Sequence, residues 1–185
     1  MTCHDDYSDG TASMPSLARP LYVVGVDDSV GAATALRWAL AKAEATNGEV
    51  YAVHVFHART LLAPASSPYV PADVPAETFE QQTALVAARA MVQRALPVGA
   101  PTQGRLEIAA VAGDPWRTLV DISRGSDALV LGASHRAALV ARVLGSTAAA
   151  CAANASCPVM IVPEGWLPGQ PAGRGPRGTP ALIDA

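Results

Sequence analysis

Short apolar segments alternate with longer helical segments along most of this chain, and this alternation constrains the fold more than any other feature. The apolar segments lie at 21–26, 50–56, 106–111, 128–131 and 159–162. Strands that alternate with helices, and that are apolar throughout, are typical of a parallel sheet covered by helices on both faces. The sequence therefore predicts an α/β fold with an open five-stranded parallel sheet and helices on both of its faces.

Local signals predict where the helices begin and end. Ser29 is expected to cap the first helix, and Asn47 to close it in a left-handed conformation. Asp114 and Pro115 are expected at the N-cap and first positions of the third helix. Ser146 is expected to cap the fourth helix. Each signal places a helix in a gap between two apolar segments.

Length and composition indicate one folded domain with a tail at each end. Of the 185 residues, 50% are hydrophobic and 16% are charged, as in compact soluble proteins. Residues 1–18 are small and polar, and residues 165–185 are rich in Gly and Pro. We therefore expect a disordered N-terminal tail, a folded domain over 19–164 and a Gly/Pro-rich C-terminal tail.

Charge, hydropathy and cysteine content argue against several classes of protein. The net charge of -3 lacks the basic excess typical of proteins that bind nucleic acid. The apolar segments are much shorter than the ~20 residues that a transmembrane helix needs, and no secretory signal is visible. Three cysteines suggest neither a disulfide framework nor a metal cluster. We expect a cytoplasmic protein with no nucleic-acid or membrane partner.

The best candidate for a ligand site is the junction between the fourth strand and the fourth helix. Gly132 ends the strand and, without a Cβ, allows close approach by backbone or ligand. The helix that starts near Gly145 offers free N–H groups to an anion. The pattern indicates a phosphate cradle at the carboxyl end of a strand, where open α/β sheets bind ligands. Its candidate residues are Leu131, Gly132, Gly145, Ser146 and Thr147.

Four further motifs lie at ends of the expected strands and helices, at 24–29, 54–55, 113–115 and 157–162. They are similar to the first strand and turn, the end of the second strand, the start of the third helix and the closing strand of the universal stress protein family. The resemblance covers 19–163, nearly all of the folded region. It implies a Rossmann-like fold of the adenine nucleotide α-hydrolase type.

The nucleotide-binding branch of that family carries the pattern G-x2-G-x9-G-[S/T]. Gly132, Gly145 and Ser146 stand at the spacing of its first glycine, last glycine and hydroxyl residue, but His135 replaces the middle glycine. A histidine keeps any backbone contact made there, whereas a requirement for φ > 0 would force the loop to change. His135 and Arg136 are either phosphate partners or solvated loop side chains. The resemblance implies ATP as the ligand, with Mg²⁺ in its company.

The same resemblance assigns the nucleoside end of the ligand to the first two strands. It implies that Asp27 reaches the ribose or the metal, and that Val26 and Val55 flank the adenine. By residue type alone, Asp27 fits the turn and cap of the first helix equally well. His54 and His57 fit packing or surface roles better, since no set of side chains at metal-ligand spacing accompanies them. No protein-built metal site is predicted.

The resemblance implies a non-catalytic ATP-binding regulatory module of the stress response. Two alternatives stay open: a nucleotide-free dimeric interaction protein and an adenine-nucleotide-dependent enzyme. The sequence carries no P-loop, no Gly-x-Ser-x-Gly elbow and no positioned general base, so no catalytic residue is predicted. Whether bound ATP is slowly hydrolysed stays open.

The last apolar segment is expected to form an uncharged edge strand of the sheet. Such an edge exposes unpaired N–H and C=O groups and is normally covered. The resemblance implies that the strand pairs with its twin across a two-fold axis. We therefore expect a homodimer through Val159, Met160, Ile161 and Val162.

Overall fold

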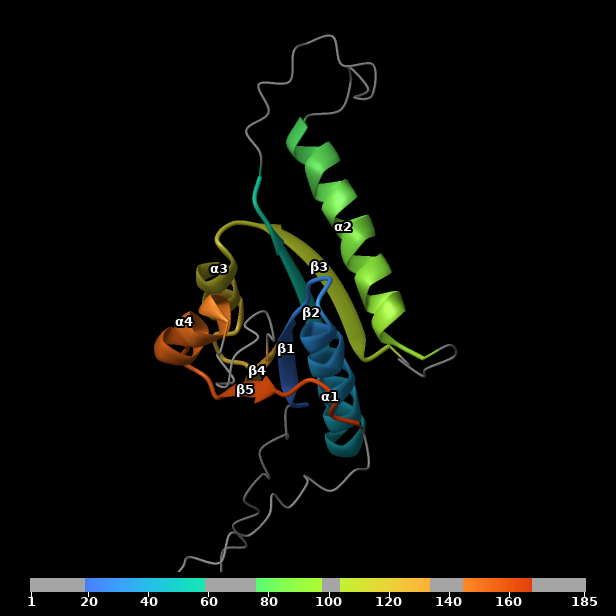
Figure 1. The fold of residues 1–185 in the computed structure, drawn as a ribbon, viewed down its shortest axis with the longest axis vertical. Helices are drawn as coiled ribbons and strands as arrows, with labels where there is room; N and C mark the ends of the chain where they lie inside the picture. The colour runs from blue at the N-terminus through green and yellow to red at the C-terminus, as the bar shows by residue number, and fades with distance from the viewer. Residues whose placement is uncertain (1–18, 59–75, 98–103, 134–144, 168–185) are drawn as a thin grey trace, which may run out of the picture.

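A parallel five-stranded sheet forms the centre of the protein (Figure 1). The computed structural model describes residues 19–58, 76–97, 104–133 and 145–167. The sheet has the strand order β3-β2-β1-β4-β5, and every neighbouring pair is parallel. The strands are β1 (Leu21–Gly25), β2 (Glu49–Phe56), β3 (Leu106–Ala112), β4 (Ala128–Gly132) and β5 (Val159–Val162). The predicted fold class is confirmed.

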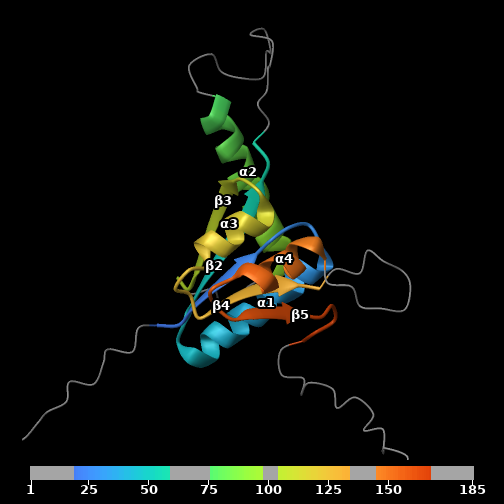
Figure 2. The same cartoon turned by 90° about the vertical axis from the view of Figure 1, so that its left-hand side faces the viewer.

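Four helices cover the two faces of the sheet, and each pair encloses its own core. Helices α1 (Val30–Thr46) and α2 (Ala76–Ala95) lie on one face, and α3 (Pro115–Ile122) and α4 (Ser146–Asn154) on the other. Figure 1 shows α3 and α4 to the left of the sheet, and the turned view of Figure 2 brings them toward the viewer. Successive strand residues point to opposite faces, so Val24 joins the core around Leu36 while Val23 joins the core around Leu119.

The strand order reverses between β1 and β4. The chain adds β2 and β3 on one side of β1, then returns to place β4 and β5 on the other. Right-handed crossovers put helices on opposite faces when the direction of winding changes, which explains why α3 and α4 lie across the sheet from α1 and α2. At such a reversal the loops after the two central strands diverge and leave room for a ligand.

Four of the five predicted helix boundary residues are confirmed, among them Pro115 at the first position of α3. The Ser29 side chain accepts a hydrogen bond of 3.0 Å from the Ala32 N–H, and Asn47 closes α1 with φ of 53°. Asp114 caps α3 through a 3.3 Å bond from the Arg117 N–H. The prediction for Ser146 is wrong. Gly145 is the N-cap of α4, so Ser146 is the first residue of the helix itself.

The described residues reach slightly beyond the expected end of the domain. Trp166, placed in the tail by composition, packs against the core on the α1 side. The N-terminal tail and residues 168–185 lie outside the described residues. Among the helices that the structure describes, none is both long and apolar enough to cross a membrane.

Candidate functional site

A pocket of about 490 Å³ lies where the strand order reverses, at the carboxyl ends of the central strands. It is lined by the start of α1 and of α4, by α3 and by the ends of β1, β2 and β4. Its volume is in the range of small-molecule sites, about 300–1,000 Å³. Eight predicted site residues line it: Val26, Asp27, Val55, Leu131, Gly132, Gly145, Ser146 and Thr147. His135 and Arg136 lie outside the described residues.

Gly132 is required by a close contact between two backbone segments. A Cβ built on it would collide with the backbone of Gly31 and with the N atom of Ala32, at the start of α1. A Cβ on Gly31 would likewise collide with the carbonyl oxygen of Ala133. Both residues must therefore be glycine for β4 to pass α1 at this distance. The contact fixes the end of β4 against the start of α1, and both segments line the pocket.

The N-terminus of α4 opens into the pocket without a side-chain cap. Gly145 precedes the helix with no side-chain hydrogen bond, and the first intrahelical bond is donated by the Ala149 N–H to the Gly145 carbonyl, at 2.9 Å. The N–H groups of Ser146, Thr147 and Ala148 thus have no acceptor among the described residues. Free N–H groups and the positive end of the helix dipole favour an anion here. The exposed Ser146 hydroxyl adds another donor.

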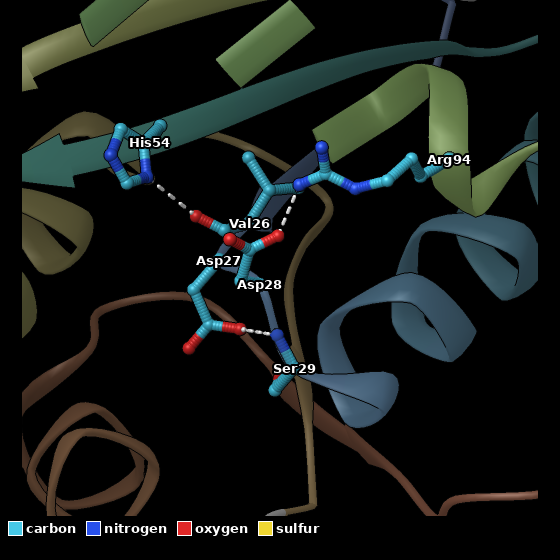
Figure 3. Close-up of polar contacts among 6 residues, drawn as sticks. All are labelled: Val26, Asp27, Asp28, Ser29, His54 and Arg94. Carbon is cyan, nitrogen blue, oxygen red and sulfur yellow. Dashed lines mark hydrogen bonds and ion pairs between the residues drawn. The ribbon is translucent and has the colours of Figure 1, made fainter. Parts of the chain in front are cut away.

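Side chains of the turn between β1 and α1 bind the backbone of the same turn (Figure 3). Asp27 Oδ1 accepts from the Ser29 N–H at 2.9 Å, and Ser29 in turn caps α1. Asp28 forms an exposed ion pair with Arg94 of α2. Asp27 therefore has the turn role expected from its residue type. It is also exposed and lines the pocket, which leaves its second carboxylate oxygen available to a ligand.

The N–H and the carbonyl of Val26 are both hydrogen-bonded to residues of β2. Its N–H donates to the Val53 carbonyl at 2.9 Å, and its carbonyl lies 3.0 Å from Nδ1 of His54. Because a carbonyl oxygen only accepts, the His54 Nδ1 carries the hydrogen. His54 is half-buried, and His57 is exposed. Sequence analysis treated both histidines as packing or surface residues and gave no reason to link His54 to this turn.

Val55 presents backbone hydrogen-bonding groups toward the pocket. Successive residues of a parallel strand direct their N–H and C=O groups to alternate sides. Val53 accepts from Val26 on the β1 side, so Val55 also faces that side, beyond the point where β1 ends at Gly25. No backbone hydrogen bond joins Val55 to Val26 among the described residues. One donor and one acceptor of Val55 are therefore available beside apolar walls from Val53 and Leu131.

The pocket therefore has an apolar end and an end with unpaired N–H donors. Among the described lining residues Asp27 is the only charged side chain. No cluster of three or more His, Cys, Asp or Glu side chains suitable for a metal occurs within the described ranges. The arrangement suits a ligand with a flat apolar ring at Val55, hydroxyls near Asp27 and an anionic group at α4.

Neither of the two described cysteines lines the pocket. Cys151 is fully buried and its Sγ donates to the Trp116 carbonyl at 3.7 Å. Burial, with a smaller contribution from nearby Cys157, raises the pKa of the Cys151 thiol to about 11, which keeps it protonated and unreactive at neutral pH. Cys157 is partly buried and lies two residues before β5.

Sequence comparison places the chain among known proteins. The model of the universal stress protein family matches residues 22–163. A universal stress protein of Mycobacterium tuberculosis is 31% identical over 144 residues, which cover 76% of this chain and 46% of the relative. A second one from that organism is 30% identical over 146 residues, with coverage of 76% and 46%. The chain spans about half the length of the curated relatives it matches.

Structural comparison finds the same fold in solved universal stress proteins. The universal stress protein UspA from Lactobacillus plantarum has a TM-score of 0.56 and 26% identity, over 78% of this chain and 99% of that one. A universal stress protein solved in complex with cAMP has a TM-score of 0.55 and 24% identity, over 80% of this chain and 98% of that one.

Proposed function

The chain belongs to the universal stress protein family, and we propose that it is a non-catalytic ATP-binding module that regulates partners in the stress response. The observation that carries the proposal is the uncapped N-terminus of α4 beside the end of β4, in a pocket of about 490 Å³. A protein of this fold was solved in complex with cAMP, so the fold is able to hold an adenine nucleotide.

The ligand is proposed to lie across the carboxyl ends of the three central strands. The adenine packs against Val53 and Val55, and the free N–H and C=O groups of Val55 pair with the edge of the base. The ribose hydroxyls bind Asp27, and the phosphates bind the N–H groups at the start of α4. Arg136 belongs to this proposal as an additional phosphate partner, and His135 belongs to it through its backbone N–H.

Mg²⁺ fits this site only as a companion of the phosphates. Mg²⁺ prefers oxygen ligands and commonly keeps several waters while it binds one or two carboxylates and substrate phosphates. Asp27 is the only charged side chain among the described lining residues, and the proposal places it at the ribose. The phosphates and water would therefore have to supply the coordination.

The same shortage of ionisable groups favours binding without turnover. Hydrolysis of ATP needs a group that orients or deprotonates water close to the terminal phosphate. Among the described residues of the pocket, Asp27 is the only candidate, and the proposal places it at the ribose.

Calorimetry and mass spectrometry test the proposed ligand. Nucleotide released by acid from the purified protein is expected to be ATP, and titration is expected to give a micromolar or weaker Kd for ATP and weaker binding of GTP. His135→Gly tightens binding if the histidine strains the loop. No heat at millimolar ATP, together with no released nucleotide, would contradict the proposal and leave the nucleotide-free interaction protein.

We also propose that the protein is a homodimer through β5. This strand is an edge of the sheet, and the Met160 side chain is 41% exposed while Val159 and Ile161 are half-buried. Ile161 packs against the core, so a charge there would disturb the fold itself. Met160→Lys is the cleaner test, with Val86→Lys, at a 66% exposed position of α2, as its control.

Sedimentation velocity at micromolar concentration is expected to give a dimer for the wild type and for Val86→Lys, and a monomer for Met160→Lys. A monomeric wild type would contradict the homodimer. The cytoplasmic location is part of the same proposal and rests on the sequence alone.

A further inference from the structure

We propose that His54 is a positioning residue of the nucleotide site, which ends β1 at Gly25 and keeps the backbone of Val55 free for the ligand. The role deepens the proposed function and rests on it. His54 does not line the pocket. It acts through the Val26 carbonyl, which accepts from its Nδ1 at 3.0 Å (Figure 3).

The register of the sheet shows what this hydrogen bond replaces. Gly25 pairs with Val53, and the Val26 N–H still donates to the Val53 carbonyl at 2.9 Å. In a continuing parallel ladder the next bond would run from the Val55 N–H to the Val26 carbonyl. The structure has the side chain of His54 on that carbonyl instead, and no backbone bond between Val26 and Val55 among the described residues. His54 therefore takes the acceptor that would have used the Val55 N–H.

The same bond fixes the direction of the chain that follows. Val26 is buried and held from β2 at both its N–H and its carbonyl. Asp27 comes next, and its Oδ1 binds the Ser29 N–H at the start of α1. Figure 3 shows the ring of His54 directed at the Val26 carbonyl, while the carboxylate of Asp27 extends away from it toward Ser29. Loss of the His54 bond would release both the Val26 carbonyl and the base of the Asp27 turn.

Amide substitutions separate this role from simple packing. The side-chain amide nitrogen of Asn falls near the position of a histidine Nδ1, whereas that of Gln falls near Nε2. His54→Asn is therefore expected to keep ATP affinity within about threefold of the wild type. His54→Ala and His54→Gln are expected to lose about tenfold. His57→Ala, at an exposed histidine three residues further on, is the matched control and is expected to bind as the wild type does.

Calorimetric titration of ATP into the five proteins gives the first test, with thermal unfolding of each ligand-free protein measured beside it. Restored affinity in His54→Asn but not in His54→Gln supports positioning through the Nδ1 hydrogen. Equal affinity in the wild type and His54→Ala would overturn the proposal. Losses of affinity that merely follow losses of stability across all three His54 variants would overturn it as well.

Nuclear magnetic resonance gives a second test that needs no ligand. Ring nitrogen spectra should show His54 protonated at Nδ1, and hydrogen exchange at the Val55 amide should slow in His54→Ala as the ladder extends to Val26. If the wild type binds no ATP, the proposed function fails while this measurement still decides the role of His54. Hydrogen on Nε2, or unchanged exchange at Val55, would overturn the positioning role in either case.

Discussion

Two strand-to-helix junctions line the pocket, and only one of them has a side-chain cap at its helix N-terminus. Between β1 and α1, Ser29 accepts from the Ala32 N–H and Asp27 accepts from the Ser29 N–H. Between β4 and α4, Gly145 provides no side-chain bond. At the first junction a side chain of the turn itself caps the helix and fixes the local geometry. At the second, no described side chain occupies the N–H groups of Ser146, Thr147 and Ala148, so it is the better candidate to bind charge.

The two junctions meet at a close backbone contact. Gly31 and Gly132 allow the end of β4 to pass the start of α1. The contact therefore fixes these two walls of the pocket against each other before any ligand arrives. Such preorganisation lowers the entropic cost of binding.

The largest loss of stability is expected from a change that pushes the end of β4 away from the start of α1. Gly132→Ala introduces a Cβ against the backbone of Gly31 and Ala32, and because a backbone cannot swing aside, we expect the free energy of unfolding to fall by about 3 kcal/mol. Gly25→Ala is the control, since its Cβ meets only the flexible ends of Leu131 and Leu119. Urea denaturation measures both. Equal losses in the two variants would contradict the special role of the Gly31–Gly132 contact.

A side-chain cap at the N-terminus of α4 should keep the phosphates of the ligand from binding there. Gly145→Asp is expected to weaken ATP binding at least tenfold, because the new carboxylate occupies the N–H groups and repels phosphate. Gly145→Asn caps equally well without the charge, so it should lose less. Both should change stability by only a few tenths of a kcal/mol relative to glycine. Calorimetry that finds wild-type affinity for ATP in both variants would exclude the start of α4 as the phosphate site.

The two serines of the junctions should affect different quantities. Ser29→Ala removes the α1 cap and should lower the free energy of unfolding by ~1 kcal/mol. Ser146 is exposed and is not the N-cap of α4, so Ser146→Ala should leave stability nearly unchanged while it weakens ATP binding several-fold. Thermal unfolding and calorimetry on the same samples separate the two effects. A loss of stability in Ser146→Ala as large as that in Ser29→Ala would show that both serines stabilise their helices to the same extent.

Removal of the ion pair beside the turn between β1 and α1 should change stability and binding least. The Arg94–Asp28 ion pair is exposed, with side-chain accessibilities of 61% and 71%, and water and salt screen such pairs strongly. Arg94→Ala should therefore change stability and ATP affinity very little, and less in 0.5 M salt. A change in affinity as large as that of His54→Ala would show that the turn is held mainly from α2.

Much of the fold and of the turn between β1 and α1 could be predicted because their signals are local. Ser29, Asn47 and Asp114 each act on a backbone group within a few residues, and the apolar strand segments are visible in the sequence itself. The boundary at Ser146 was off by one residue. A serine and a glycine side by side both suit the start of a helix, and only the backbone conformation decides which of them precedes it.

The features that the sequence did not reveal depend on contacts between distant segments. Gly31 stands at the start of a helix without any turn signal, and its need for a missing side chain arises from β4, about a hundred residues later. His54 acts on a carbonyl 28 positions earlier in the chain. The sequence carried the motif at 54–55, but pairing of β1 with β2 was required to show what the histidine binds.

We expect ATP to use the free N–H groups of α4 and to leave the capped N-terminus of α1 unchanged. Amide spectra of the isotope-labelled protein, recorded as ATP is added, distinguish the two helix N-termini. The amides of Thr147 and Ala148 should shift and become protected from exchange, while the Ala32 amide keeps its bond to Ser29. Saturable binding of ATP that leaves the α4 amides unchanged, or that perturbs Ala32 as strongly, would contradict it.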